Sequence, residues 1–149
     1  MKISSIRELN KIANKIKDAV LPGDAILLHG EIGVGKTTFV RLFINSCEDK
    51  NKLKKSEVLS PTFNIVFEYE FKDYKIKHFD LYRLKNDIDI NNIGLFEDID
   101  ESILLIEWPE LIKKKPTNRI ELLFKYTRRE NERLLQINSF GRLKNYEFG

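Results

Sequence analysis

The chain has 149 residues, 42% of them hydrophobic, and its 26 basic and 23 acidic residues give a formal net charge of +3. This length is enough for one hydrophobic core, so we expect residues 1–149 to form a single domain. A charge so close to balance excludes classing the chain as a nucleic-acid-binding protein on charge alone.

Three features of the sequence indicate the compartment. No apolar run approaches the roughly 20 residues that a helix needs to span a bilayer. The N-terminal MKISSIRELNK returns to charged residues too soon for a signal peptide. The single cysteine, Cys47, cannot form an internal disulfide, which fits a reducing environment. We therefore expect a cytoplasmic protein without membrane association.

The N-terminal third predicts two helices around one strand. Apolar residues recur at helical spacing over residues 5–19, at Ile6, Leu9, Ile12, Ala13 and Ile16. A turn is predicted at residues 21–24 (LPGD), and the apolar run 25–29 (AILLH) predicts a short buried strand. A second helix is predicted over residues 36–47, and the lysine-rich residues 48–57 are predicted to form a surface loop.

The rest of the chain is rich in predicted strands. Alternation or a continuous apolar run predicts strands at residues 63–71, 74–82, 103–108, 119–126 and 133–140. The first two are predicted to pair as a hairpin, and the last two are predicted to form a closing pair. The acidic residues 84–102 between them predict a helix interrupted by turns.

The segment GEIGVGKT at residues 30–37 matches the pattern G-x-x-x-x-G-K-[ST], between a predicted strand and a predicted helix. Its glycines let the chain turn with N–H groups inward, toward an anion at the positive end of the helix. Lys36 would contact the outer phosphates, and the Thr37 hydroxyl would bind Mg²⁺. The alternative is a tight turn with chance glycines, but motif and context together favour phosphate binding.

The motif therefore predicts a P-loop protein of the α/β class, a three-layer domain with a mixed sheet as its central layer. Such a protein needs an acidic residue near the metal, at the end of a neighbouring strand. Glu107 follows four aliphatic residues, and Asp80 ends another strand-like segment. Each alone could be a solvated strand end, but beside a P-loop a role at Mg²⁺ or at the attacking water is favoured. The sequence lacks an N-K-x-D motif after the loop, so ATP is favoured over GTP by elimination.

Two other functions remain open on the residues alone. A small-molecule kinase would need a lid of arginines, and residues 126–133 contain three, although solvated charges are the commoner explanation. A nucleotide-gated binding subunit would hydrolyse ATP only incidentally. The basic runs 52–55 and 113–115 lack interleaved aromatic residues, so direct tRNA binding by this chain is not favoured.

Four segments in this order make the sequence similar to the TsaE family, the P-loop ATPase of bacterial tRNA threonylcarbamoyladenosine biosynthesis. They are residues 30–39 (GEIGVGKTTF), 60–69 (SPTFNIVFEY), 78–84 (HFDLYRL) and 104–110 (LLIEWPE). The resemblance implies that the chain binds and hydrolyses Mg·ATP and acts with TsaD and TsaB. These partners transfer a threonylcarbamoyl group to the adenosine beside the anticodon, so contact with tRNA would run through them.

The resemblance also implies roles for individual residues. The nucleotide loop would comprise Glu31, Ile32, Gly33, Val34, Gly35, Lys36, Thr37 and Thr38. Thr37 and Glu107 would hold Mg²⁺, and Asp80 would lie by the γ-phosphate as a metal-shell or water-orienting group. Thr62 would lie in a switch-like loop over the phosphates, and Trp108 near the nucleotide or a partner.

Two further residues carry narrower expectations. His78 is expected to shape the end of its strand and not to take part in catalysis. Family members often carry a Thr and a Gly where this chain has Ile6 and Asn10, so adenine or ribose contacts from the first helix are left open.

Overall fold

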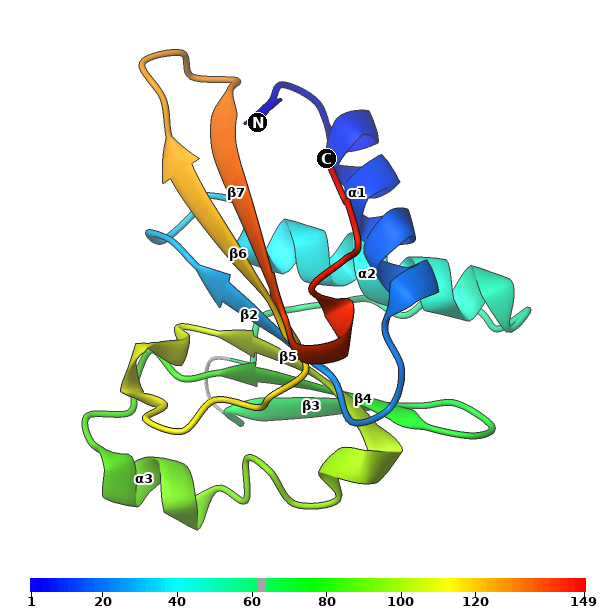
Figure 1. The fold of residues 1–149 in the computed structure, drawn as a ribbon, viewed down its shortest axis with the longest axis vertical. Coiled ribbons are helices and arrows are strands. Elements are labelled where there is room, and N and C mark those ends of the chain that lie inside the picture. Colours follow the sequence, from blue (N-terminus) through cyan, green and yellow to red (C-terminus); the bar gives the residue numbers. More distant parts are fainter. Residues whose placement is uncertain (62–63) are drawn as a thin grey trace.

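The computed structural model describes residues 1–61 and 64–149, within which a seven-stranded sheet is flanked by helices (Figure 1). The strands are β1 (Lys2–Ile3), β2 (Ala25–His29), β3 (Val66–Glu70), β4 (Lys75–Asp80), β5 (Ser102–Glu107), β6 (Arg119–Tyr126) and β7 (Arg133–Phe140). The α-helices are α1 (Ile6–Ala19), α2 (Lys36–Lys50) and α3 (Asp87–Asn92). Short 3₁₀ turns lie at Ile99–Glu101, Pro109–Leu111 and Gly141–Leu143.

The sheet is mixed, with strand order β1-β7-β6-β2-β5-β4-β3. The four central strands β6, β2, β5 and β4 run parallel, whereas β1, β3 and β7 pair antiparallel with their neighbours. Helices α1 and α2 and the C-terminal 3₁₀ turn pack on one face, and α3 with the other two 3₁₀ turns packs on the opposite face. The predicted three-layer α/β fold with a mixed sheet is confirmed.

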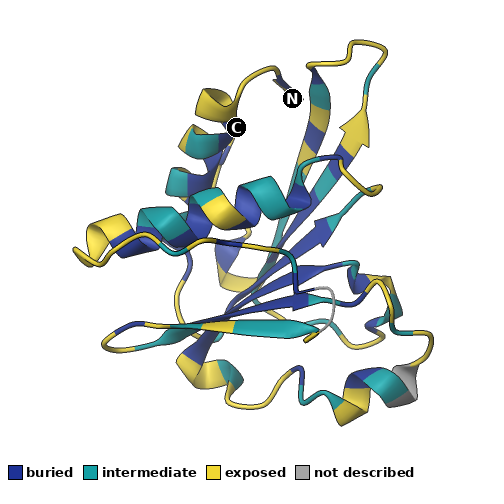
Figure 2. Ribbon diagram, turned by 180° about the vertical axis from the view of Figure 1, so that it is seen from behind, coloured by how far each residue is buried: buried dark blue, intermediate teal, exposed yellow. Residues whose placement is uncertain are grey.

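Strand β2 shows why β2 and β5, the two strands at the middle of the sheet, are apolar along most of their length. Ile26 and Leu28 belong to the hydrophobic cluster under α1 and α2, whereas Ala25 and Leu27 belong to the cluster on the opposite face. Successive side chains of a strand point to opposite faces, so a strand covered on both sides has no polar side. Figure 2 shows these central strands buried.

Helix α1 begins after Ser5, whose side chain accepts a hydrogen bond from the backbone N–H of Glu8 and so caps the helix. Its buried residues are Leu9, Ile12, Ala13, Ile16 and Ala19. Ile6, predicted to belong to this apolar stripe, is instead 56% exposed: it lies in the first turn of the helix, where it lines an open cavity and is not covered by the core. The remaining stripe is as predicted.

Two elements differ from the predictions. Helix α2 continues to Lys50, so residues 48–50 are helical and not part of a loop. The reason is that the buried carboxylate of Glu48 accepts hydrogen bonds from the backbone N–H and the hydroxyl of Ser56, which ties the following segment back to the helix. Strand β1 was not predicted, because two residues are too few to show a pattern. The other predicted strands, including the β3–β4 hairpin and the β6–β7 pair, are confirmed.

Within the described part of the chain, no helix has both the length and the apolar character needed to cross a membrane.

Candidate functional site

Three parallel strands end together at one edge of the sheet. The pairing register places Glu107 at the end of β5 opposite both Leu28 of β2 and Asp80 of β4. The loop that follows β2 leads directly into α2, which begins at Lys36. The carboxyl ends of parallel strands are where α/β proteins bind ligands. The fold therefore brings the glycine loop and both predicted carboxylates to one place.

The glycine loop has a backbone that other residues would not adopt. Gly30 has φ of 142°, and a Cβ there would lie 2.7 Å from the carbonyl oxygen of Phe124 and 2.9 Å from Val34 Cγ1. Gly33 and Gly35 also have positive φ, 75° and 124°. Glycine is the residue that tolerates this region at little cost. The loop thus turns sharply between β2 and α2, as the motif predicts.

The Lys36 side chain folds back over this loop. It is only 5% exposed, and its Nζ donates hydrogen bonds to the carbonyl oxygens of Gly30 and Glu31, the latter at 3.1 Å. The same ammonium lies 3.9 Å from the centre of the Trp108 ring, a cation–π distance. Neutral groups therefore hold the ammonium at the mouth of the loop, where a phosphate oxygen could replace them.

Burial lowers the pKa of Lys36 below its ordinary value of 10.5. The negative charges of Glu107, Asp80 and Glu110 act in the opposite direction but do not compensate for the lost hydration. An anion bound in the loop would favour the protonated form. The Lys36 ammonium is therefore not fully compensated by the nearby carboxylates, and a bound anion would stabilise it.

Glu107 is a buried carboxylate, 2% exposed, with two side-chain partners. The Thr37 hydroxyl, in the first turn of α2, donates to its Oε1 at 2.9 Å and to its Oε2 at 3.2 Å. His78 of β4 is fully buried, and its Nε2 lies 2.6 Å from Oε2. His78 therefore does more than shape the end of its strand, because it contacts the predicted metal ligand directly.

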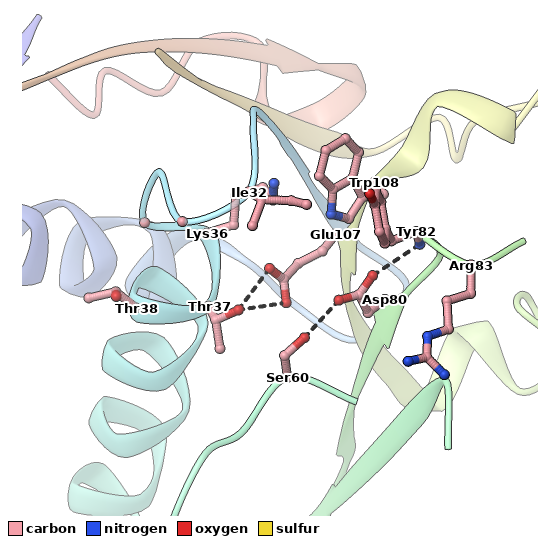
Figure 3. A pocket seen from close by; sticks show the side chains of 12 residues that line it. Ile32, Lys36, Thr37, Thr38, Ser60, Asp80, Tyr82, Arg83, Glu107 and Trp108 are labelled. Carbon is pink, nitrogen blue, oxygen red and sulfur yellow. Dashed lines mark hydrogen bonds between the residues drawn. The ribbon is translucent and has the colours of Figure 1, made fainter. Parts of the chain in front are cut away.

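Asp80 is the second carboxylate, and it is only partly buried. Its Oδ2 accepts a hydrogen bond from the Ser60 hydroxyl at 2.7 Å, and its Oδ1 accepts one from the Tyr82 backbone N–H at 3.0 Å. Figure 3 shows Asp80 beside Glu107, with Thr37 on the far side of Glu107. The two carboxylates thus differ in exposure: Glu107 is almost completely buried, whereas Asp80 is only partly buried.

These groups line a cavity of about 430 Å³ (Figure 3). Its lining comprises Ile32, Gly33, Gly35, Lys36, Thr37, Thr38, Ser60, Asp80, Tyr82, Arg83, Glu107 and Trp108. Among the predicted loop residues, Glu31 and Val34 are not in this lining: the Glu31 carbonyl binds Lys36, and Val34 is buried in the core. The predicted contact from Thr62 concerns a residue outside those described.

A second cavity, of about 460 Å³, lies on the other side of the loop. It shares Gly33, Gly35 and Thr38 with the first cavity. The rest of its lining is Ile3, Ser4, Ser5, Ile6, Leu9, Val34, Phe124, Glu130, Asn131 and Arg133. Ile6 therefore faces a space next to the loop, whereas Asn10 is not part of this lining.

The β6–β7 pair also supports the loop, which sequence reasoning missed. Tyr126 donates from its hydroxyl to the Ile32 carbonyl at 2.7 Å, and Arg133 Nε donates to the Val34 carbonyl at 3.2 Å. The two side chains face each other across the strands, with the guanidinium 4.7 Å from the Tyr126 ring centre. Arg133 also donates to the carbonyls of Glu130 and Glu132, so it is bound to backbone and is not a mobile lid.

Comparison with known proteins identifies relatives of this chain. The family described as threonylcarbamoyl adenosine biosynthesis protein TsaE matches residues 3–135. The tRNA threonylcarbamoyladenosine biosynthesis protein TsaE of Aquifex aeolicus is 37% identical over 138 residues, which cover 91% of this chain and 92% of that protein. The protein of the same name from Rickettsia conorii is 37% identical over 111 residues, or 74% of this chain, and the match spans 61% of its own length.

A solved structure agrees with the fold. The crystal structure of Bacillus subtilis YdiB superposes with a TM-score of 0.73 at 26% identity, covering 97% of this chain and 86% of that one.

Proposed function

The chain belongs to the TsaE family, and from this premise we propose that it is a Mg²⁺-dependent ATPase of tRNA threonylcarbamoyladenosine biosynthesis. One observation carries the proposal: the glycine loop, Lys36 and the carboxylates of Glu107 and Asp80 surround one cavity. We propose that residues 1–149 act as one ATPase domain.

The loop and α2 would bind the phosphates. The backbone N–H groups of the loop and the positive end of a 15-residue helix meet at this point. Lys36 would exchange the carbonyls of Gly30 and Glu31 for oxygens of the outer phosphates. Burial lowers the pKa of Lys36 in the free protein, and a bound anion would stabilise its ammonium form, which already contacts the Trp108 ring.

The oxygen atoms of Thr37 and Glu107 fit Mg²⁺, which prefers oxygen ligands and is usually bound by one or two carboxylates together with phosphates. Within residues 1–61 and 64–149, no group of three or more His, Cys, Asp or Glu side chains is arranged to hold a metal alone. This fits an ion that needs the nucleotide to complete its coordination. Bound Mg²⁺ would neutralise charge on the β- and γ-phosphates.

We propose different tasks for the two carboxylates. Glu107 is buried and bound to Thr37, so it would act on the metal side. Asp80 lines the cavity and is held by Ser60 and the Tyr82 backbone, so it would orient the attacking water by accepting a hydrogen bond from it. Trp108, whose ring centre lies 4.7 Å from that of Tyr82 with the two rings tilted by 45°, would close the opposite wall of the cavity.

The second cavity offers a place for the base of the nucleotide. It adjoins the loop and has the apolar side chains Ile6, Leu9 and Phe124 in its lining. An aromatic base could pack on these side chains, with the polar groups of Ser5 and Asn131 near its edge. We propose ATP as the nucleotide, and that Ile6 packs against it.

We further propose that TsaD and TsaB are the partners and that they gate slow turnover. Ile32 and Tyr82 line the cavity yet are 64% and 56% exposed, so a docked protein could contact both the nucleotide site and these side chains. Contact with tRNA would then be indirect, through the partners. This role would require the chain to be in the cytoplasm, together with its tRNA substrate.

A binding experiment tests the nucleotide site separately from the partners. We expect a fluorescent ADP analogue to bind the wild-type chain more tightly with Mg²⁺ than in EDTA, and ATP to be hydrolysed slowly. Lys36→Ala should lose binding, whereas Lys77→Ala, which removes an equally buried lysine that donates to the Glu97 carbonyl, should retain it. Failure of the wild-type chain to bind either nucleotide would contradict the proposal.

A further inference from the structure

The imidazole of His78 occupies an unusual position in the sheet. It lies in β4 opposite Leu105 of β5, two residues before the point where Asp80 pairs with Glu107. Alternate residues of a strand share a face, so His78 and Asp80 project on the same side as Glu107. This is the side covered by α1 and α2, where the neighbouring Ile76 and Leu105 belong to the hydrophobic cluster.

The contact between His78 and Glu107 has a defined direction. Nε2 lies 2.6 Å from Glu107 Oε2, and an ionised carboxylate can only accept a hydrogen bond. Nε2 therefore carries the hydrogen and donates it to the charged carboxylate. The Thr37 hydroxyl approaches the same carboxylate from α2. Glu107 is thus held from β4 and from α2 at once.

Packing alone does not account for a histidine at this position. The other ring nitrogen, Nδ1, is buried and finds no hydrogen-bond partner among the described residues. Buried polar atoms without partners are rare in folded proteins because they lose their hydration without compensation. An aliphatic side chain like that of the neighbouring Ile76 would avoid this penalty. The residue is therefore explained by what Nε2 does for Glu107.

We propose that His78 is a positioning residue, which fixes the Glu107 carboxylate so that Thr37 and Glu107 present their oxygens correctly to the metal ion of the bound nucleotide. The inference rests on the proposed Mg²⁺-dependent function. Groups that hydrogen-bond to ligating or orienting carboxylates typically change metal affinity by about 10–100-fold when they are removed. The glycine loop and Lys36 do not contact His78 in the interactions described above, so the metal-free phosphate site should be little affected.

Two variants separate this role from a structural one. His78→Leu keeps the volume and removes the donor, whereas His78→Gln keeps an N–H donor near the position of Nε2. The affinity of a fluorescent ADP analogue is measured in EDTA and across a Mg²⁺ titration. For His78→Leu we expect a Mg²⁺ midpoint raised by about 10-fold or more, with affinity in EDTA within about threefold of wild type. For His78→Gln we expect a midpoint near that of wild type.

Ile76→Ala is the matched control, because it perturbs the same strand and face without touching Glu107. It should lower thermal stability but leave the Mg²⁺ midpoint unchanged. An unchanged midpoint in His78→Leu, or equal losses in EDTA and in Mg²⁺, would overturn the inference. A wild-type chain that binds nucleotide without any Mg²⁺ dependence would instead overturn the proposed function.

A measurement on the metal-free wild-type chain makes the test independent of how the variants fold. Nitrogen-15 NMR of the histidine rings distinguishes the two tautomers of a neutral imidazole. We expect a hydrogen on Nε2 of His78 and none on Nδ1. A hydrogen found on Nδ1 alone would remove the donor from Glu107, and the inference would fail.

Discussion

The Thr37 hydroxyl lies 2.9 Å from Oε1 and 3.2 Å from Oε2 of Glu107, and so joins the first turn of α2 to the end of β5. These residues are 70 positions apart in the sequence. The contact brings together, within the fold itself, the oxygens proposed to bind Mg²⁺. Such pre-organisation reduces the cost of arranging them when the ligand binds.

Substitutions of Glu107 and Asp80 should have different effects on Mg²⁺-dependent binding and on turnover. In Glu107→Gln the buried amide loses the negative charge on the metal side, so we expect a higher Mg²⁺ midpoint for nucleotide binding and lower turnover. In Asp80→Asn we expect Mg²⁺-dependent binding within about threefold of wild type but turnover reduced by about 100-fold, because a neutral amide oxygen is a much weaker acceptor for the water than a carboxylate. Steady-state phosphate release and nucleotide titrations measure both quantities.

Glu97→Gln, which changes an exposed carboxylate away from the cavity, serves as the control and should leave both quantities unchanged. A raised Mg²⁺ midpoint in Asp80→Asn together with a normal one in Glu107→Gln would reverse the assignment of the two roles.

Gly30 should be the glycine of the loop that is most sensitive to substitution for steric reasons. A Cβ at this position meets the Phe124 carbonyl at 2.7 Å, and φ is 142°. We expect Gly30→Ala to lower the free energy of unfolding by about 2–3 kcal/mol. Gly23→Ala, where φ is 98° and nothing lies within 4 Å of the Cβ, should cost only about 1 kcal/mol. Equal losses in urea unfolding would show that the clash is not the cause.

Tyr126 should influence nucleotide binding although it lies outside the motif. Tyr126→Phe removes the hydrogen bond to the Ile32 carbonyl, so we expect a loss of about 1 kcal/mol or less in stability and a weaker affinity for ADP by a few-fold. The control is Tyr146→Phe, which removes an exposed hydroxyl at the C-terminal end of the chain. The prediction is wrong if both variants bind ADP as tightly as wild type.

Nucleotide affinity should fall with rising pH in a range set by Lys36. Burial holds the pKa of Lys36 below 10.5 in the free protein, whereas bound phosphates favour the protonated form and raise this pKa. Binding therefore takes up a proton between the two values, and affinity decreases as the pH rises through the lower one. Calorimetry in buffers with different ionisation enthalpies measures the uptake.

Lys36→Arg provides the control for this pH dependence, because a guanidinium stays protonated throughout the range. If it binds nucleotide at all, its affinity should not show the alkaline decrease. The same decrease in Lys36→Arg would assign the titration to another group.

The sequence predicted most of the elements because their signals are local. The buried strand at residues 25–29 and the amphipathic stripe of α1 follow from hydrophobic periodicity, and the loop follows from a motif whose spacing reflects its chemistry. Asp80 and Glu107 could be paired in advance because parallel strands bring their carboxyl ends to one edge. Their common cavity agrees with that reasoning.

The missed features depend on contacts between distant residues. Nothing near Tyr126 or Arg133 indicates that they hold the loop, because the carbonyls they contact lie more than 90 positions away. His78 likewise looks like a strand residue until β5 places Glu107 beside it. Its strand, KIKHFD, already contains two lysines and an aspartate, so no local signal distinguishes the histidine before its partner is known.

We propose that this chain is the ATPase of tRNA threonylcarbamoyl transfer, and steady-state ATP turnover is the measurement that decides it. Turnover is measured for the chain alone and with a cognate TsaB–TsaD pair, with Glu107→Ala as the inactive control. We expect weak turnover alone, a clear rise with the partners, and loss of both in the control. Turnover that ignores the partners but rises with a small phosphoryl acceptor would contradict the claim and indicate a kinase.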